Sequence, residues 1–184
     1  MQLRSLIPVV ALTATALLGS PATVSESLLP LVKSSADRVQ IADQVAAAKF
    51  GTTQPIDDPA REQQVLDSVA AKAPSLGLDP ALVVRFFRDQ IEANKIVQRG
   101  LFAYWTAHPG QAPTTRPDLS AIRPGIDRIT DSLLHALAGT TAARSGRLCD
   151  ARIFVDTHLV DLERRLDHLH AEALAQSLDS ACLG

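Results

Sequence analysis

The stretch Arg38-Val-Gln-Ile-Ala-Asp-Gln-Val-Ala-Ala-Ala-Lys49 places a cation at each end of an apolar helical pattern. Apolar residues recur at three- and four-residue spacings from about Ser25 to Phe50, which predicts one helix that ends at Gly51. Arg38 and Lys49 are about three turns apart, so they fall within about 20° of each other on one face. Two cations along an apolar strip either snorkel to solvent or meet anionic partners from the protein or from a ligand.

The composition of the 184-residue chain favours one helical domain. Apolar residues make up 46% of it and aromatic residues only 4%, with Ala and Leu more frequent than the β-branched residues that favour strands. Charged residues make up 21% and leave a formal net charge of -2, which gives no basic excess for nucleic acid. We therefore expect an all-α protein whose partner is not a nucleic acid.

The amino terminus is typical of a secretory signal peptide. Arg4 precedes an apolar run over residues 6–18, and Ser20-Pro21-Ala22 offers small residues to a signal peptidase. The run is shorter than the about 20 residues of a membrane span, and no later segment is apolar enough to cross a bilayer. We expect cleavage near Ala22, with residues 1–22 as signal peptide and residues 23–184 as one exported domain, periplasmic or secreted.

Cys149 and Cys182 are the only two cysteines. An oxidising compartment would let them pair, and closing that loop would stabilise the fold by roughly 3 to 4 kcal/mol. The alternative is a pair of free buried thiols.

The rest of the chain repeats the helical pattern. Asp58-Pro59 and Asp79-Pro80 each supply an N-cap followed by proline at the first helical position, which predicts helices to about residues 73 and 105. Asp118 caps a shorter helix that ends at Gly139. A single last helix is expected over residues 148–178, with a seam against other helices formed by Val155, Leu159, Leu162, Leu166, Leu169 and Ala173.

Polar groups accompany these helices at two places. Asp58, Arg61 and Glu62 occupy the start of the second helix, and Asn94 and Gln98 share one face of the third because they are four residues apart. The amide pair taken alone is interpreted more simply as two side chains bonded to each other or to a neighbour.

Together these segments resemble the all-helical chorismate mutases. The resemblance runs through most of the chain in one order, and the signal peptide, Pro117-Asp-Leu-Ser-Ala-Ile-Arg123 and the two late cysteines are similar to the exported subclass. It implies a single-domain bundle of five to six helices of the chorismate mutase type II kind, an isomerase of aromatic amino acid biosynthesis. The other matching segments are Arg38 to Lys49, Pro55 to Glu62, Leu78-Asp-Pro80, Phe87-Arg-Asp-Gln-Ile91 and Asn94 to Gln98.

The resemblance also implies roles for eight residues. Arg38 and Arg123 would bind the two substrate carboxylates with support from Arg61, because guanidinium forks bind carboxylates bidentately. Lys49 and Gln98 would donate hydrogen bonds to the ether oxygen. The remaining three, Asp58 and Glu62 near the substrate hydroxyl and Asn94 beside Gln98, would complete the site, although the family more often has Ser or Thr at the position of Asn94.

The implied reaction converts chorismate to prephenate by a unimolecular pericyclic rearrangement that requires no metal or other cofactor. The enzyme holds the reactive chair and stabilises the charge that develops as the ether bond breaks. A neutral amide at Gln98 donates at any ordinary pH, so we expect activity to persist from neutral to mildly alkaline pH.

Other interpretations are weaker. His168 and His170 point about 160° apart on a helix and cannot share a metal, so no metal site is expected. The second functional hypothesis is an exported helical binding module derived from a mutase that no longer turns over. A homodimer is expected from the resemblance, although Arg123 would complete the site within one chain.

Overall fold

The computed structural model describes residues 27–183, so the expected signal peptide over residues 1–22 lies outside the described part. Within that part the chain forms helices and no strand, as the composition predicts. None of these helices is long and apolar enough to cross a membrane. The elements are α1 (Leu29–Gln40), α2 (Ala42–Lys49), α3 (Pro59–Lys72), the 3-10 turn η1 (Ala73–Leu76), α4 (Pro80–Ala107), the 3-10 turn η2 (Pro109–Gln111), α5 (Leu119–Gly139), α6 (Thr141–Arg144), α7 (Cys149–Arg164) and α8 (His168–Gln176).

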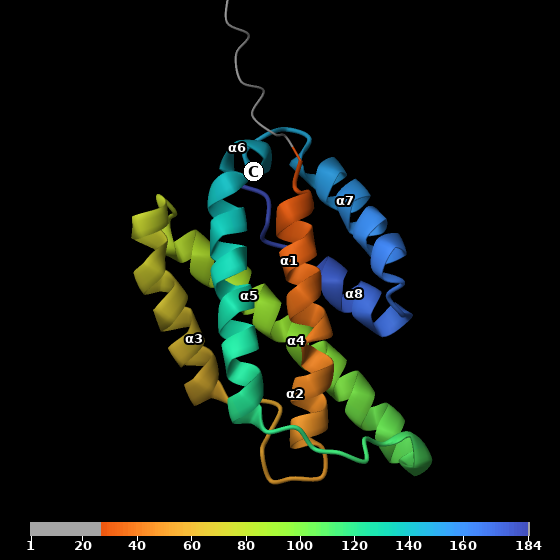
Figure 1. Ribbon diagram of the computed structural model, residues 1–184. Helices are drawn as coiled ribbons and strands as arrows, with labels where there is room; N and C mark the ends of the chain where they lie inside the picture. Colours follow the sequence, from red (N-terminus) through yellow and green to blue (C-terminus); the bar gives the residue numbers. More distant parts are fainter. Residues whose placement is uncertain (1–26, 184) are drawn as a thin grey trace, which may run out of the picture.

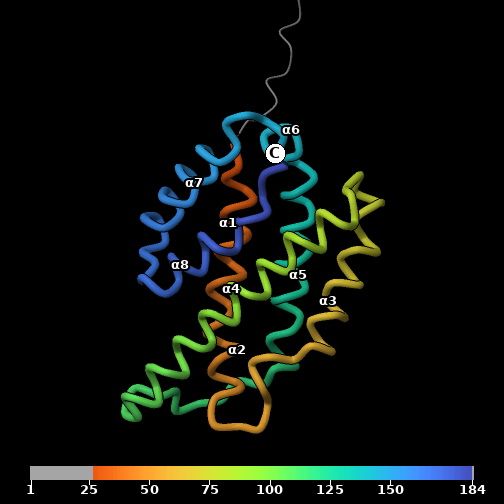
Figure 2. The backbone as a smooth tube through the Cα atoms, turned by 180° about the vertical axis from the view of Figure 1, so that it is seen from behind, coloured from red at the N-terminus to blue at the C-terminus, as the bar shows by residue number. Residues whose placement is uncertain are grey.

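The helices pack around the long helix α4, which crosses the bundle obliquely (Figure 1). α1 and α2 follow one another along nearly one line, and α5 runs beside them. α3 packs on α4, α7 packs on α1 at the edge of the molecule, and α8 packs on α4 and α1 (Figure 2). Helices α1 to α5 therefore meet in one part of the bundle, whereas α7 and α8 lie along its edge (Figure 1).

The main core is one large cluster of aliphatic side chains around two aromatic rings, with two small clusters beside it. Phe86 and Phe87 of α4 are fully buried and contact each other edge to face, with their ring centroids 5.8 Å apart. A buried amide connects three elements across this core, because Gln90 Nε2 donates to Ser35 Oγ at 3.1 Å and to the carbonyl oxygen of Ser177 at 2.7 Å. Each such bond satisfies a polar group that burial would otherwise penalise.

The three predicted helix starts are confirmed. The side chain of Asp58 accepts a hydrogen bond from the backbone N–H of Arg61, and Asp79 and Asp118 cap α4 and α5 in the same way. Each cap satisfies one of the backbone donors that a helix leaves unpaired at its start. These caps fix where α3, α4 and α5 begin, which sets the positions of the polar side chains one turn further on.

The single first helix is wrong in detail, because a turn at Ile41 separates α1 from α2. Ile41 keeps right-handed helical dihedrals, and the N–H of Val45 still donates to its carbonyl oxygen at 3.3 Å. The two helices thus form a nearly continuous rod, so the approximate alignment of Arg38 and Lys49 survives the interruption.

The single last helix is also wrong. Arg165 adopts the left-handed conformation, with φ of 51° and ψ of 50°, and ends α7, after which the side chain of Asp167 caps α8. The break splits the expected seam: Ala173 is buried in the core, but Val155, Leu159 and Leu162 are exposed on α7. The breaks at Ile41 and Arg165 each divide one expected helix into two, and α6 adds a one-turn helix, so the described residues form eight α-helices where the sequence predicted five.

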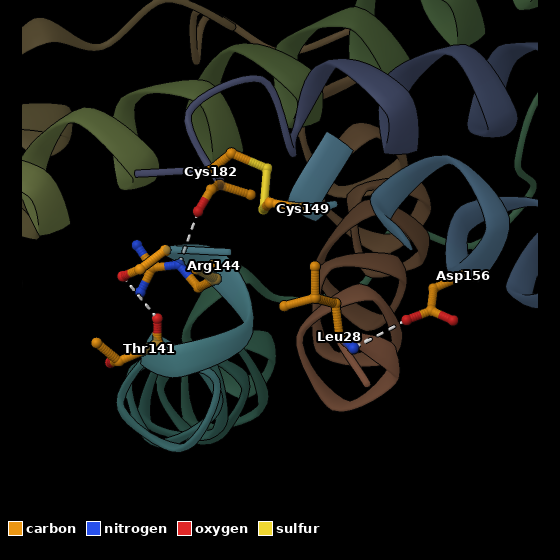
Figure 3. The surroundings of a disulfide bond; sticks show 8 residues. Leu28, Thr141, Arg144, Cys149, Asp156 and Cys182 are labelled. Atoms are coloured by element: carbon orange, nitrogen blue, oxygen red, sulfur yellow. Dashed lines mark hydrogen bonds between the residues drawn. A yellow bond between two sulfur atoms is a disulfide. The ribbon is translucent and has the colours of Figure 1, made fainter. Parts of the chain in front are cut away.

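The carboxyl-terminal segment is fastened to the start of α7 by a disulfide between Cys149 and Cys182 (Figure 3). The bond closes a loop of 33 residues, which stabilises the fold by about 4 kcal/mol in the chain-entropy model. Beside it, buried Arg144 donates from Nε to the carbonyl oxygen of Ala181 at 2.7 Å and accepts the N–H of Leu183 with its own carbonyl. The chain end is therefore held by covalent and hydrogen bonds together.

A buried histidine joins α8 to α2. His170 Nε2 lies 2.8 Å from Asp43 Oδ1, and its Nδ1 lies 2.7 Å from Asp167 Oδ1. The hydrogen bond with Asp43 is the main cause that raises the pKa of His170 from 6.5 to about 9, with burial opposing it and Asp167 adding to it. The folded protein therefore favours the imidazolium.

Because the folded state binds this proton more tightly, the stabilisation is fully present below pH 6.5 and is lost as the pH rises through about 9. We expect the free energy of unfolding to fall by about 2 kcal/mol across this window. The full shift, converted at about 1.4 kcal/mol per pKa unit, would give a larger fall, but both carboxylates are half exposed and solvent screens their charges. Chemical denaturation at pH 6 and pH 9.5 measures it. His170→Gln should abolish this fall in the free energy of unfolding, whereas the exposed control His168→Gln should keep it. An equal fall in both variants would contradict the assignment of the pH dependence to His170.

Candidate functional site

The structure brings all eight predicted site residues to one pocket of about 300 Å³, a volume at the lower end of small-molecule sites. The pocket lies where α1, α2, α3, α4 and α5 converge. Its apolar walls come from side chains such as Val45, Ile91 and Ile126. The eight polar residues that line it are Arg38, Lys49, Asp58, Arg61, Glu62, Asn94, Gln98 and Arg123.

Arg38 lies deepest and is only 6% exposed. Its Nη1 donates to Thr130 Oγ1 of α5 at 3.1 Å, and its guanidinium lies 5.9 Å from the ring centroid of Phe87. Burial lowers the pKa of Arg38 to about 10, with Asp127 opposing the shift, so the group stays charged at neutral pH. Its Nε is buried without a hydrogen-bond partner among residues 27–183, which leaves a donor for an anion.

Lys49 ends α2 and is partly buried. Its Nζ donates to the carbonyl oxygen of Ile56 at 3.4 Å, the long end of the hydrogen-bond range. Burial lowers the pKa of Lys49, and the charges of Asp58, Asp57 and Glu62 oppose this. An ammonium has three donors, so at least two remain for a bound molecule.

Asn94 and Gln98 form a directed pair of amides on α4. Asn94 Nδ2 donates to the backbone carbonyl of Arg38 at 3.1 Å, and a carbonyl oxygen can only accept. Asn94 Oδ1 is thereby left as the acceptor for Gln98 Nε2 at 2.7 Å. The network fixes the orientation of both amides. Gln98 Nε2 also lies 3.5 Å from the backbone carbonyl oxygen of Asn94, so its second N–H is held only by a contact at the long limit of a hydrogen bond.

The start of α3 forms the acidic side of the pocket. Asp58 caps the helix by accepting the backbone N–H of Arg61, and Glu62 Oε1 accepts the backbone N–H of Asp58 at 3.3 Å. Arg61 is exposed at the rim, where its Nη1 donates to Gln64 Oε1 at 3.2 Å. The capping contacts hold both carboxylates in place without a ligand.

Arg123 lines the pocket from the start of α5. It is exposed, and Asp118 precedes it by about one turn. Hydrogen bonds from Ser120 are the main cause that lowers the pKa of Asp118, and the charge of Arg123 adds to them. Arg123 thus closes the pocket from the same chain that supplies its other walls.

The sequence analysis missed Lys95, a fifth cation in the pocket. Its Nζ lies 2.7 Å from Glu92, 3.2 Å from Glu62 and 3.3 Å from Asp57, and its side chain is 9% exposed. Burial alone would lower the pKa of Lys95, but these hydrogen bonds outweigh it and raise the pKa. Its three-residue spacing from Glu92 indicates an ion pair on a helix surface, and nothing in the sequence reveals its burial.

The lining carries five cations, Lys95 included, against two carboxylates, which leaves a net charge of +3. An all-helical protein with a small, partly apolar cationic pocket is a binder of small polyanions, and its preorganised donors suit chemistry driven by electrostatics.

Sequence comparison identifies the family. Residues 30–99 match the family described as chorismate mutase type II. The chain is 37% identical over 176 residues to a secreted chorismate mutase of Mycolicibacterium smegmatis, covering 94% of this chain and 97% of that protein. It is 34% identical over 158 residues to the secreted chorismate mutase of Mycobacterium tuberculosis, covering 86% and 79%. The crystal structure of a chorismate mutase from Burkholderia phymatum superposes with a TM-score of 0.81 at 38% identity, covering 85% of this chain and 96% of that one. The chain belongs to the all-helical chorismate mutases.

Lys95 should control the affinity of the pocket for anions. Lys95→Met leaves Glu62 and its neighbours uncompensated, and Coulomb's law at an effective dielectric constant of about 20 gives about 2 kcal/mol for two unit charges about 8 Å apart. We expect KM for chorismate to rise at least about tenfold while kcat changes by less than about threefold.

Two matched variants control this measurement. Lys95→Arg keeps the charge and should restore most of the affinity, and Lys33→Met removes a surface lysine that pairs with Glu163 on the far side of α1. An unchanged KM in folded Lys95→Met would show that the buried lysine has no electrostatic effect on the substrate.

Proposed function

We propose that this pocket is the active site in which the chain binds chorismate and converts it to prephenate. The chain is a chorismate mutase, an isomerase, by its family. The observation that carries the assignment of the site is that eight residues chosen from the sequence line one cationic pocket. A pericyclic rearrangement needs positioning and charge stabilisation, and this pocket offers both through fixed donors.

We assign the two carboxylates of the substrate to the arginines of the pocket. Arg38 offers a buried Nε that has no partner among residues 27–183, and Arg123 lines the same pocket from α5. Arg61 supports them from the rim, where a change of rotamer frees it from Gln64. Two carboxylates held by opposed guanidinium groups fix the ends of a flexible dianion, so the reactive chair is selected at binding.

The ether oxygen is assigned to Lys49 and Gln98. This atom gains negative charge in the transition state, and donors aimed at it stabilise that state more than the ground state. Lys49 brings a full positive charge, and Gln98 brings the N–H whose present contact, 3.5 Å to the Asn94 carbonyl oxygen, is weak enough to exchange for a substrate oxygen. Asn94 acts through Gln98, because it fixes the amide orientation.

The carboxylates at the start of α3 are assigned to the substrate hydroxyl. Asp58 and Glu62 can each accept a hydrogen bond from it while keeping their capping contacts, since a carboxylate has about four acceptor sites. Lys95 forms an ion pair with Glu62 and so offsets the negative charge that would otherwise repel the substrate.

Export and assembly follow the named relatives. Both mycobacterial proteins are called secreted, which supports residues 1–22 as a signal peptide cleaved near Ala22 and a periplasmic or secreted mature domain. We propose that the mature domain forms a homodimer. Arg123 lines the pocket together with the other seven predicted residues of the same chain, which supports a site that one subunit can complete.

A non-catalytic exported binding module is the second candidate, and a direct assay separates the two. The loss of chorismate absorbance with purified, oxidised mature protein measures turnover. Folded protein that binds chorismate but does not consume it would favour the binding module.

Removing either cation on the deep side of the pocket should abolish most activity. Arg38→Ala and Lys49→Ala should each lower kcat/KM at least 100-fold, about 2.7 kcal/mol, because each removes charge stabilisation of the transition state. The exposed Arg85→Ala, also on a pocket helix, serves as control and should be unchanged. Near-wild-type rates in either variant would remove that residue from the active site.

The pH profile should report the amide at Gln98. The wild-type rate should stay flat from pH 5 to 8, because an amide does not titrate. Gln98→Glu should approach it only at low pH and lose about tenfold per pH unit once the carboxyl ionises. A wild-type rate that collapses between pH 5 and 8 would contradict the role of Gln98.

A further inference from the structure

The hydroxyl of Thr130, near the middle of α5, is bonded differently from other hydroxyls of the same helix. A threonine or serine inside a helix normally points to solvent or donates to the carbonyl oxygen four residues earlier. Ser132 within α5 and Thr140 at its end donate in this way, at 3.0 Å and 2.6 Å. Thr130 Oγ1 instead accepts from Nη1 of buried Arg38 at 3.1 Å, and within residues 27–183 this is its one hydrogen bond. The hydroxyl therefore binds a side chain of α1 and not its own helix.

This bond decides which donor of Arg38 is left for a ligand. A guanidinium group is planar and carries its N–H donors in a fixed fork, so holding one nitrogen restricts the directions of the others. Nη1 is held by Thr130, and the ring centroid of Phe87 lies 5.9 Å from the guanidinium carbon. Nε is buried and has no partner among residues 27–183. The guanidinium is thus oriented before any ligand binds.

Thr130 and Arg123 lie on one face of α5. Arg123, Ile126, Asp127 and Thr130 follow one another at spacings of three, one and three residues, which is the pattern of a single helical face. Arg123 and Thr130 are therefore about two turns apart, about 10 Å along the helix axis. α5 supplies one guanidinium group of the pocket itself and holds another, that of Arg38, through Thr130.

We propose that Thr130 is a positioning residue that holds Arg38 at a fixed distance from Arg123, so that the two guanidinium groups bind a dianion of one carboxylate spacing. The proposal rests on the assignment of the substrate carboxylates to these two arginines under the proposed function. The carboxylates stay bound throughout the rearrangement, so a loss of positioning weakens the ground state and the transition state alike. Its effect should therefore fall mainly on KM and less on kcat.

A second cavity of about 350 Å³ adjoins the pocket between α3 and α5, and both Thr130 and Asp127 line it. The charge of Asp127 raises the pKa of Arg38 against the larger lowering by burial. Among residues 27–183 no carboxylate forms an ion pair with Arg38, so Asp127 supports its charge without occupying a donor that the substrate needs. The cavity also gives water access to the site when the hydroxyl is removed, so variants at Thr130 should fold.

Exchange of the hydroxyl tests this role in the oxidised mature protein. Thr130→Val keeps the shape and removes the acceptor, so kcat/KM for chorismate should fall about tenfold, mostly through KM. Thr130→Ser keeps the hydroxyl and should stay within about twofold of wild type. Thr106→Val removes an exposed hydroxyl on α4 that donates to the carbonyl oxygen of Phe102 at 2.7 Å, and it should leave both constants unchanged. Thermal melting confirms that each variant is folded.

A double-variant cycle asks whether the hydroxyl acts through Arg38. Thr130→Val should lower kcat/KM about tenfold in the wild-type background but less than about twofold in an Arg38→Ala background, where no guanidinium group remains to be positioned. A merely structural effect of the valine would lower the rate equally in both backgrounds.

NMR of the guanidinium nitrogens reports the orientation of Arg38 without turnover. Rotation about the Nε–Cζ bond averages the two Nη signals of a mobile guanidinium group, whereas a hydrogen bond that holds Nη1 keeps the signals separate. Arg38→Lys identifies the signals of Arg38, because it removes them. The ligand-free wild type should show separate Nη signals that merge in Thr130→Val and stay separate in Thr130→Ser.

Three results would overturn the role of Thr130. They are a kcat/KM of folded Thr130→Val within about twofold of wild type, a loss that persists in full in the Arg38→Ala background, and merged Nη signals in the wild type. A wild type that does not consume chorismate would instead overturn the proposed function. The NMR signals would then still decide whether Thr130 holds Arg38.

Discussion

The buried guanidinium of Arg38 is the constraint on which the arrangement of the pocket helices depends. Among the described residues no carboxylate lies within ion-pair distance of it, and an unpaired buried charge costs several kcal/mol. The protein offsets part of that cost with Thr130 from α5 and the ring of Phe87 from α4. These contacts require α1, α4 and α5 to meet where they do. The remaining cost is what a bound anion relieves.

The acidic residues near the pocket are arranged so that they do not cancel the positive potential of its cations. Glu62 and Asp57 are both held by Lys95, and Asp57 also pairs with Arg99, so the carboxylates nearest the pocket already have cationic partners on α4. Within residues 27–183, neither Arg38 nor Arg123 forms an ion pair with a carboxylate of α4 or any other element. The protein thus stays nearly neutral overall while a few cations face one cavity, a charge distribution that suits a small dianion.

The sequence grouped the residues that line this pocket better than it placed the ends of the helices. Caps such as Asp58 and repeats of three and four residues are local signals, and the resemblance supplied residues at long range such as Arg123. The break at Arg165 was missed because a left-handed arginine has no signature comparable to glycine or proline. Lys95 was missed because its burial arises from carboxylates brought together by the fold. The seam predicted over residues 155–173 is wrong for α7, where Val155, Leu159 and Leu162 are exposed, because the break at Arg165 turns the chain before that stripe meets another helix.

This last point separates two parts of the molecule. α1 to α5 contain the whole pocket, whereas α7 and α8 are fastened to them by the disulfide, by Arg144 and by the contact of His170 with Asp43. α8 packs on α4 and shields the core, which frees one face of α7 from any role in the fold.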